Sequence, residues 1–358
     1  MFGTIRKWAN HYFQDEEAVL LVALIVGFMV VVAALGQVLV PFFASVVVAY
    51  LLQGVIGSLE KRKVPYWIAF STCYVLFLGV LTVLIFLVLP LVWNQLTHLF
   101  NALPNMFHKG QAILLQFPVD HPDLLSAQQL HDWVELGKSE VGAFGQKLLS
   151  FSFTLLPNVV SILVYLVLVP VLVFFLLKDK VYLVGWLAAR LPKRRPLLNS
   201  IWAEMDQQLS NYVRGKVIEI VITGAASFVL FVSLDLNYAA LLALLVGLSV
   251  VVPYIGVAIV TVPVALIGYF QWGATDLFAY LMIGHLILQI PDGYVLVPLL
   301  FSEAVNLHPV GIILAVLVFG SFWGFWGVFF AIPLATFVKA IMTSWPRAIK
   351  QVHQEGVT

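Results

Sequence analysis

Long apolar stretches separated by short polar ones run through the whole chain. Five stretches contain no Asp, Glu, Lys or Arg, and they cover residues 18–57, 64–108, 148–177, 236–275 and 304–338. About 20 apolar residues in a helix cross a bilayer core about 30 Å thick. The pattern therefore predicts a protein that crosses a membrane several times as α-helices.

The lengths of the apolar runs indicate where individual spans begin and end. We expect uninterrupted spans at residues 18–35, 38–56, 66–93, 153–177 and 217–234. Three later stretches are interrupted: residues 236–275 by Pro253 and Gly256, 277–301 by Pro291 and Gly293, and 308–338 by a glycine-rich run at 320–327. Proline and glycine both disfavour a helix interior. The sequence thus predicts an all-α, polytopic transmembrane helical bundle of about eight spans with broken or re-entrant segments, or ten if two long stretches form hairpins.

Two polar regions lie between these spans. Residues 94–152 are predicted to form a small outward, extracytoplasmic helical segment, and residues 178–216 a cytoplasmic basic segment in which 197–212 lies on the membrane surface as an amphipathic helix. The expected organisation is therefore three spans in 1–93, the outward segment 94–152, the fourth span 153–177, the basic segment 178–216, and a C-terminal bundle with broken helices and a cytoplasmic tail in 217–358.

The basic residues are distributed unevenly between the two sides of such a bundle. Alternating spans place 16 of the 19 Lys and Arg residues on one side and only Lys109, Lys138 and Lys147 on the other. Because Lys and Arg are enriched in cytoplasmic loops, the first side is the cytoplasmic one. Both termini are then expected in the cytoplasm.

The composition excludes several classes of protein. Hydrophobic residues make up 62% and charged residues 10% of the chain, and the net charge is +1, whereas nucleic-acid binding needs a basic face. The sequence carries no nucleotide-binding loop, metalloprotease helix, nucleophile elbow or paired-cysteine metal site. We therefore expect no enzyme activity, no cofactor, no metal and no nucleic-acid partner.

Polar residues beside the helix breaks are the first candidates for function, because ionisable groups are costly in a membrane. Asp292 stands between Pro291 and Gly293, and it either lines a transport pathway or is a solvated loop acid. Glu303 and Asn306 precede a further break at Pro309. Glu303 is either a proton or cation site or an acid in an interfacial loop.

A second group of polar residues follows one helical face into the fifth span. Its members are Gln208, Asn211, Gly215, Glu219 and Thr223. Lys216 and Glu219 are three residues apart and can neutralise each other, either as an ion pair at the membrane surface or as part of the pathway. His285 is either a satisfied interior histidine or a proton relay.

Several segments together resemble a known family. They are residues 174–180 (FFLLKDK), 211–216 (NYVRGK), 253–256 (PYIG), 292–309, 323–327 (WGFWG) and 332–335 (IPLA). This order resembles the autoinducer-2 exporter family of bacterial inner-membrane proteins, in its PerM-type permease branch. The resemblance implies about eight spans, an outward segment before the fourth and homo-oligomers. It also adds Arg214, within the second segment, to the candidate pathway residues.

The resulting functional expectation is a secondary transporter in the bacterial inner membrane, exporting a small solute. Related members of the family are described as autoinducer-2 exporters and others as sodium/proton antiporters, so a cation antiporter is an alternative. A non-transporting membrane scaffold or regulatory partner is another. The expected partners are membrane lipid, a small molecule or ion, and further copies of the chain.

The predicted orientation can be tested with single cysteines in a Cys73→Ala background. In intact cells, an impermeant thiol reagent should label Ser126→Cys and leave Ser200→Cys unlabelled until the membrane is opened, because the two positions lie on opposite sides. Labelling of Ser200→Cys in intact cells would contradict the topology.

Overall fold

The computed structural model describes residues 16–36, 38–120, 163–193, 195–253, 255–291 and 308–342, and within them every regular element is helical. Among these described residues, five helices are long and apolar enough to cross a membrane: Val40–Lys61, Tyr66–Ala112, Pro196–Ser233, Ile255–Trp272 and Val310–Phe329. Five shorter apolar helices accompany them: Val19–Leu35, Leu163–Lys178, Ala239–Ser249, Asp276–Ile290 and Ala331–Met342. The predicted all-α, polytopic helical fold is confirmed.

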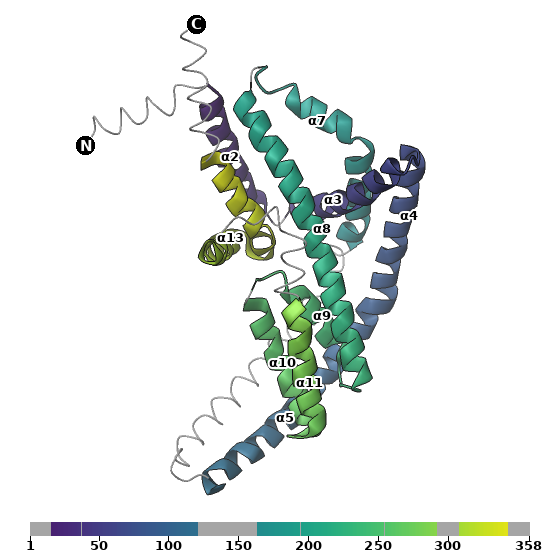
Figure 1. The fold of residues 1–358 in the computed structure, drawn as a ribbon, viewed down its shortest axis with the longest axis vertical. Coiled ribbons are helices and arrows are strands. Elements are labelled where there is room, and N and C mark those ends of the chain that lie inside the picture. Colours follow the sequence, from purple (N-terminus) through teal and green to yellow (C-terminus); the bar gives the residue numbers. More distant parts are fainter. Residues whose placement is uncertain are drawn as a thin grey trace, which may run out of the picture.

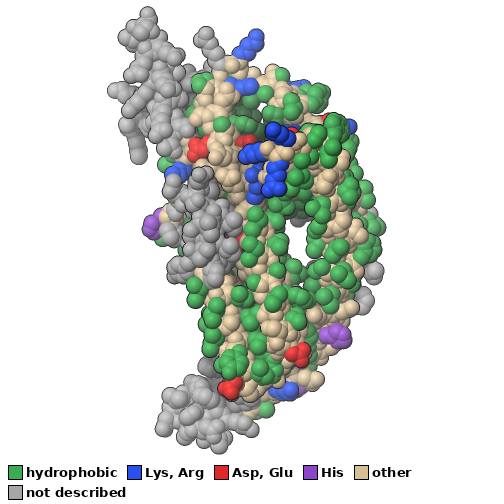
Figure 2. Space-filling model, turned by 45° about the vertical axis from the view of Figure 1, so that its right-hand side comes forward, with side chains coloured by type: hydrophobic (Ala, Val, Ile, Leu, Met, Phe, Trp, Pro, Cys, Tyr) green, Lys and Arg blue, Asp and Glu red, His purple; other side chains and the backbone are tan. Residues whose placement is uncertain are grey.

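Large apolar side chains cover the outside of these helices (Figure 2). Phe86, Leu87 and Val229 are 77%, 67% and 67% exposed. A soluble domain rarely exposes contiguous apolar surface on this scale. The exposed apolar surface is the one that lipid tails cover.

The N-terminal region consists of long helices joined by short turns (Figure 1). α2 (Glu16–Leu35) and α3 (Val40–Lys61) are followed by α4 (Tyr66–Val83), which continues through the π-helical turn η1 (Leu84–Val88) into α5 (Leu89–Asp120). The π turn ends two residues before Pro90, which has no N–H for the carbonyl four residues earlier, and it takes up this irregularity without ending the helix. α5 continues to Asp120 and so passes residue 93, where the sequence suggested that the third span ends.

The helix Leu163–Lys178 packs against α3 and α4. Val173 and Leu177 share a buried cluster with Ile56 of α3 and Phe70 of α4. The Tyr66 hydroxyl donates a hydrogen bond to the Leu177 carbonyl at 2.8 Å. This helix continues through a turn into α7 (Lys180–Ala188).

The long helix α8 runs along the long axis of the molecule (Figure 1). It contains the 38 residues Pro196–Ser233 without interruption. The sequence suggested a surface helix over 197–212 and a separate span from residue 217. The structure differs because Tyr212, Val213, Gly215 and Lys216, at the expected boundary, are all buried by packing against other helices. A continuous helix cannot lie along the membrane surface and also cross it.

A helical hairpin, which we call hairpin A, packs along α8. It consists of α9 (Ala239–Ser249) and α10 (Ile255–Trp272). Gly224 of α8 and Gly247 of α9 allow close approach, since a β-carbon on Gly247 would lie 2.9 Å from the Ile220 carbonyl oxygen. α11 (Asp276–Pro291) then packs against α8 and α10.

A second hairpin, hairpin B, folds within α13 (Pro309–Phe329): its first arm is residues 309–323, and its second arm continues through Phe329 into the helix Ala331–Met342. The chain reverses at Gly324, whose φ of 59° and ψ of −135° are not helical. A β-carbon on Gly327 would collide with the Phe319 carbonyl, so only glycine permits this close approach. The reversal lies in the glycine-rich run that the sequence indicates as a break.

Gly256→Ala should destabilise hairpin A, because the added β-carbon would collide with the Ser249 carbonyl. We expect a loss of about 1–3 kcal/mol, measured as a lower thermal unfolding midpoint in detergent. Gly57→Ala in α3 is the matched control, since open space surrounds Gly57 and alanine is the better helix former. Equal midpoints for the two variants would contradict the observed packing of the turn.

Candidate functional site

The turns of the two hairpins meet beside the middle of α8. Val251, in the turn of hairpin A, shares a buried cluster with Phe329 of hairpin B and Tyr212 of α8. Val252 packs against a second cluster that contains Ala315 and Ala331 of hairpin B. We call this region the hairpin junction. It brings two helix breaks that are about 75 residues apart in sequence onto one face of α8.

Two side chains of α8 bind the backbone carbonyls at these breaks. The Tyr212 hydroxyl donates to the Phe329 carbonyl at 2.7 Å, and the Lys216 ammonium donates to the Val250 carbonyl at 2.9 Å. Both carbonyls lie at helix ends, where helical partners are missing. Pro333 follows Phe329 by four residues and Pro253 follows Val250 by three, and neither has an N–H to donate. The side chains of α8 thus replace hydrogen bonds that the prolines remove.

Lys216 also forms a buried ion pair. Its Nζ lies 2.7 Å from Oε2 of Glu219, and the two side chains are only 3% and 2% exposed. The sequence indicated this pairing but left its place open between the membrane surface and the pathway. The structure places the pair in the protein interior, at the hairpin junction.

Arg214 lies on a different part of α8 and faces α3. Its guanidinium packs on Gly54, where a β-carbon would collide with it. Its Nε is buried and has no hydrogen-bond partner among the residues that the structure describes. Asp206 lies two turns before Arg214 on α8, and its Oδ1 accepts a hydrogen bond from the Tyr50 hydroxyl of α3 at 2.7 Å. Arg214 is therefore not part of the Lys216–Glu219 pair and belongs to the contact between α3 and α8.

The polar face predicted along α8 is present and extends further than expected. Glu219 and Thr223 are buried, and Ser227, at the same four-residue spacing, is fully buried as well. The sequence interpretation stopped at Thr223, although the spacing itself gave the signal to continue. Buried polar groups therefore follow α8 from the hairpin junction toward its C-terminal end.

The predicted helix-break residues occupy the following places. Pro253 lies in the turn of hairpin A, Gly256 in the first turn of α10, Pro291 at the end of α11, and Pro309 at the start of α13. His308 caps α13, with its Nδ1 accepting from the Val310 N–H at 3.3 Å. The remaining candidates, Asp292, Gly293, Glu303 and Asn306, lie outside the described residues, and their roles stay predictions.

No group of three or more His, Cys, Asp or Glu side chains that could hold a metal ion occurs in the described part of the chain. The site therefore consists of backbone carbonyls, one buried ion pair and hydroxyl groups between apolar helices. This arrangement defines a polytopic membrane protein with interrupted helices at its centre, the class to which many permeases belong.

The comparisons with known proteins identify the family. The chain belongs to the AI-2E transporter family, whose model matches residues 19–347. "Putative permease PerM" of Escherichia coli (strain K12) is 42% identical over 356 residues, which cover 99% of this chain and 100% of the relative. "Putative transport protein YueF" of Bacillus subtilis (strain 168) is 28% identical over 87% of this chain and 85% of its own length.

Glu219→Gln should destabilise the protein strongly, because it leaves the buried Lys216 cation without its counter-charge. Removing one partner of a buried pair costs about 3–5 kcal/mol, which thermal unfolding in a single detergent would detect. Lys216→Met combined with Glu219→Gln should cost less than the sum of the single changes, since no charge stays unpaired.

Glu204→Gln is the control for this comparison, because Glu204 lies on the same helix but is exposed. Its unfolding midpoint should stay near that of the wild type. The burial of the ion pair is contradicted if Glu219→Gln is as harmless as Glu204→Gln.

Proposed function

We propose that the protein is a secondary transporter of the bacterial inner membrane that exports a small solute, and that passage is controlled at the hairpin junction. The observation that carries this proposal is that two interrupted helices meet on a buried ion pair. An arrangement of this kind is costly to build in a purely structural membrane protein.

The dimensions of hairpin A support a pathway at this place. α9 has 11 residues and is therefore about 16 Å long, roughly half of a bilayer core. Its turn ends inside the molecule, on Lys216 and Tyr212 of α8. Non-helical backbone at such depth is tolerated where it is buried in protein or lines a water-filled cavity. In transporters, discontinuous helices of this kind surround the substrate.

Alternating access then requires that the two hairpins move relative to each other as well as to α8. The contacts at the junction include a hydrogen bond from Tyr212, a hydrogen bond from Lys216 and apolar packing around Val251. When a hairpin moves away, its carbonyl is exposed, and water or the polar groups of the solute replace the side chain of α8. The Lys216–Glu219 pair stays neutral as a unit in both states.

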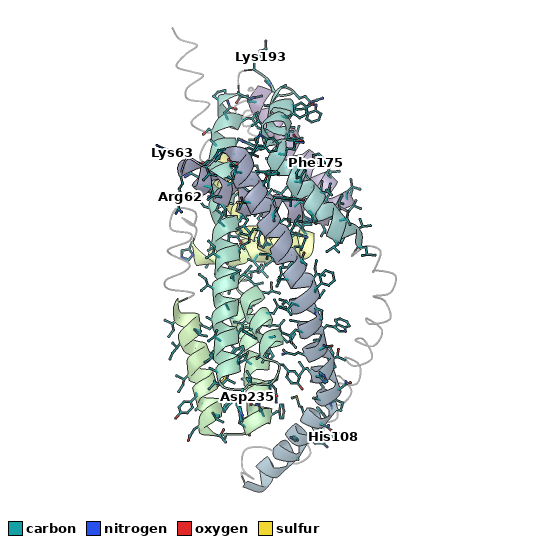
Figure 3. The ribbon with its side chains drawn as sticks, turned by 90° about the vertical axis from the view of Figure 1, so that its right-hand side faces the viewer. Arg62, Lys63, His108, Phe175, Lys193 and Asp235 are labelled. Carbon is teal, nitrogen blue, oxygen red and sulfur yellow. The ribbon has the colours of Figure 1, made fainter. Side chains whose placement is uncertain are left out.

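The orientation follows from the ends of the molecule. Arg62, Lys63 and Lys193 lie toward one end, and Asp235 and His108 lie toward the other (Figure 3). The basic end is the cytoplasmic one in this proposal, so both termini are cytoplasmic. Homo-oligomers, a further part of the proposal, use some of the exposed apolar surface that lipid otherwise covers.

Cation/proton exchange is the second candidate, and the burial of Glu219 is the observation that favours it. A carboxylate that is 2% exposed can exchange a proton for a cation when its partner moves. In this version the hairpin junction binds the coupling ion, and the hairpins move as they do in the solute exporter. A scaffold without transport differs from both because it moves no solute.

The proposal can be tested by locking the hairpins together. We expect flux in proteoliposomes, screened with a metabolite mixture under proton and sodium gradients, to stop when Val252→Cys and Ala315→Cys are joined by a short cleavable thiol crosslinker in a Cys73→Ala background. Cleavage of the crosslinker should restore flux to the uncrosslinked rate.

Each single-cysteine variant, treated with the same reagent, is the control for modification alone. Undiminished flux through the crosslinked protein would exclude relative movement of the hairpins. Absence of flux for every solute and gradient in the uncrosslinked protein would favour the scaffold.

A further inference from the structure

A second buried polar group lies deeper in the bundle, away from the hairpin junction. His285 of α11 is fully buried, 0% exposed, between α8 and α10. Its ring lies 6.2 Å from the ring of Phe231 on α8. Its Nε2 lies 3.1 Å from the Thr261 hydroxyl oxygen on α10. A histidine is thus held between three apolar helices by defined contacts.

The hydrogen bonds of Thr261 determine which ring nitrogen carries the proton. The Thr261 hydroxyl donates its only hydrogen to the Val257 carbonyl at 2.8 Å. With its hydrogen on that bond it accepts from His285, and we therefore assign the hydrogen of the neutral ring to Nε2. Nδ1 is then an acceptor with a lone pair, and it is buried without a hydrogen-bond partner in the described residues.

Two further polar side chains lie on the same side of the bundle. Gln289 follows His285 by four residues, on the same face of α11. α11 runs antiparallel to α8 (Figure 1), and His285 lies against Phe231, so Ser227, one turn before Phe231, lies near the level of Gln289. The Ser227 hydroxyl and both amide atoms of Gln289 are also buried and without partners in the described part of the chain.

These atoms are suited to hold a charged imidazole. Buried polar groups almost always have partners, so a cluster of unpartnered donors and acceptors indicates a site that is filled by water or by an ion. The described helices around His285 carry few charged residues. α9 and α10 carry no Asp, Glu, Lys or Arg, and α11 carries only Asp276 at its far end. Along α8, the nearest charges are the exposed Asp235, just beyond the end of the helix, and the mutually paired Lys216 and Glu219.

We propose that His285 is a reversible proton-binding site, with Ser227 and Gln289 as the groups that stabilise its protonated form. A hydronium ion transfers its proton to Nδ1, so that an O–H bond breaks, an N–H bond forms and water remains. The new Nδ1–H donates to the Gln289 carbonyl oxygen or the Ser227 hydroxyl once one of these side chains rotates toward the ring, while Nε2–H keeps its bond to Thr261. The use of this proton for coupling rests on the proposed function, whereas proton binding itself does not.

The test is nitrogen NMR of ¹⁵N-histidine-labelled protein in lipid nanodiscs, with His285→Gln used to assign the signals among the eight histidines. We expect His285 to show the Nε2–H tautomer when neutral and to become protonated when the pH is lowered over the range in which the protein stays folded. A ring that stays neutral throughout this range, or that shows the Nδ1–H tautomer, would overturn the proposal.

Two variants of Gln289 separate proton binding from simple burial. Gln289→Glu should move the titration midpoint to higher pH by about one unit or more, because a nearby carboxylate favours the charged ring. Gln289→Leu should move it to lower pH. An unchanged midpoint in both variants would exclude Gln289 as the stabilising group. Because the NMR titration does not depend on transport, a negative result for proton binding is distinguishable from an absence of flux in liposomes.

Discussion

The structure depends on hydrogen bonds to backbone carbonyls that the helix breaks leave without partners. In an apolar environment each unsatisfied carbonyl costs several kcal/mol, so a hairpin whose turn ends inside the bundle needs a donor at that exact depth. Tyr212 and Lys216 of α8 provide these donors for Phe329 and Val250. The two donors lie one helical turn apart, so a single face of α8 supports both carbonyls.

The same constraint explains the buried charges. The partial negative charge at the C-terminal end of α9 favours a cation there. Lys216 supplies both the positive charge and a hydrogen-bond donor. An isolated buried ammonium would be far too costly, which makes Glu219 necessary one turn away. The ion pair is thus a consequence of interrupting α9, and it gives the hairpin junction a polar centre that can respond to a solute or an ion.

Much of the fold could be predicted from the sequence, because each apolar run is a local signal. The helical class and the positions of the breaks at Pro253 and in the glycine-rich run at 320–327 follow from residue types alone. The continuity of α8 could not be predicted, because the polar residues 204–211 resemble a surface helix until the helices packed around them are known. The contact of Arg214 with Gly54 and the meeting of the two hairpin turns join residues more than 70 positions apart, and no local pattern encodes them. The residues at 292–307 lie outside the described part, so Asp292 and Glu303 remain candidates on sequence grounds.

The most direct measurement of the central claim is a cryo-electron microscopy map of the protein in lipid nanodiscs, at a resolution that shows side chains. The account predicts density for Tyr212 and Lys216 that reaches the carbonyls of Phe329 and Val250, with both hairpin turns packed on an uninterrupted α8. A map in which α9 and α10 form one continuous crossing helix, or in which Lys216 points away from the turn of hairpin A, would contradict it.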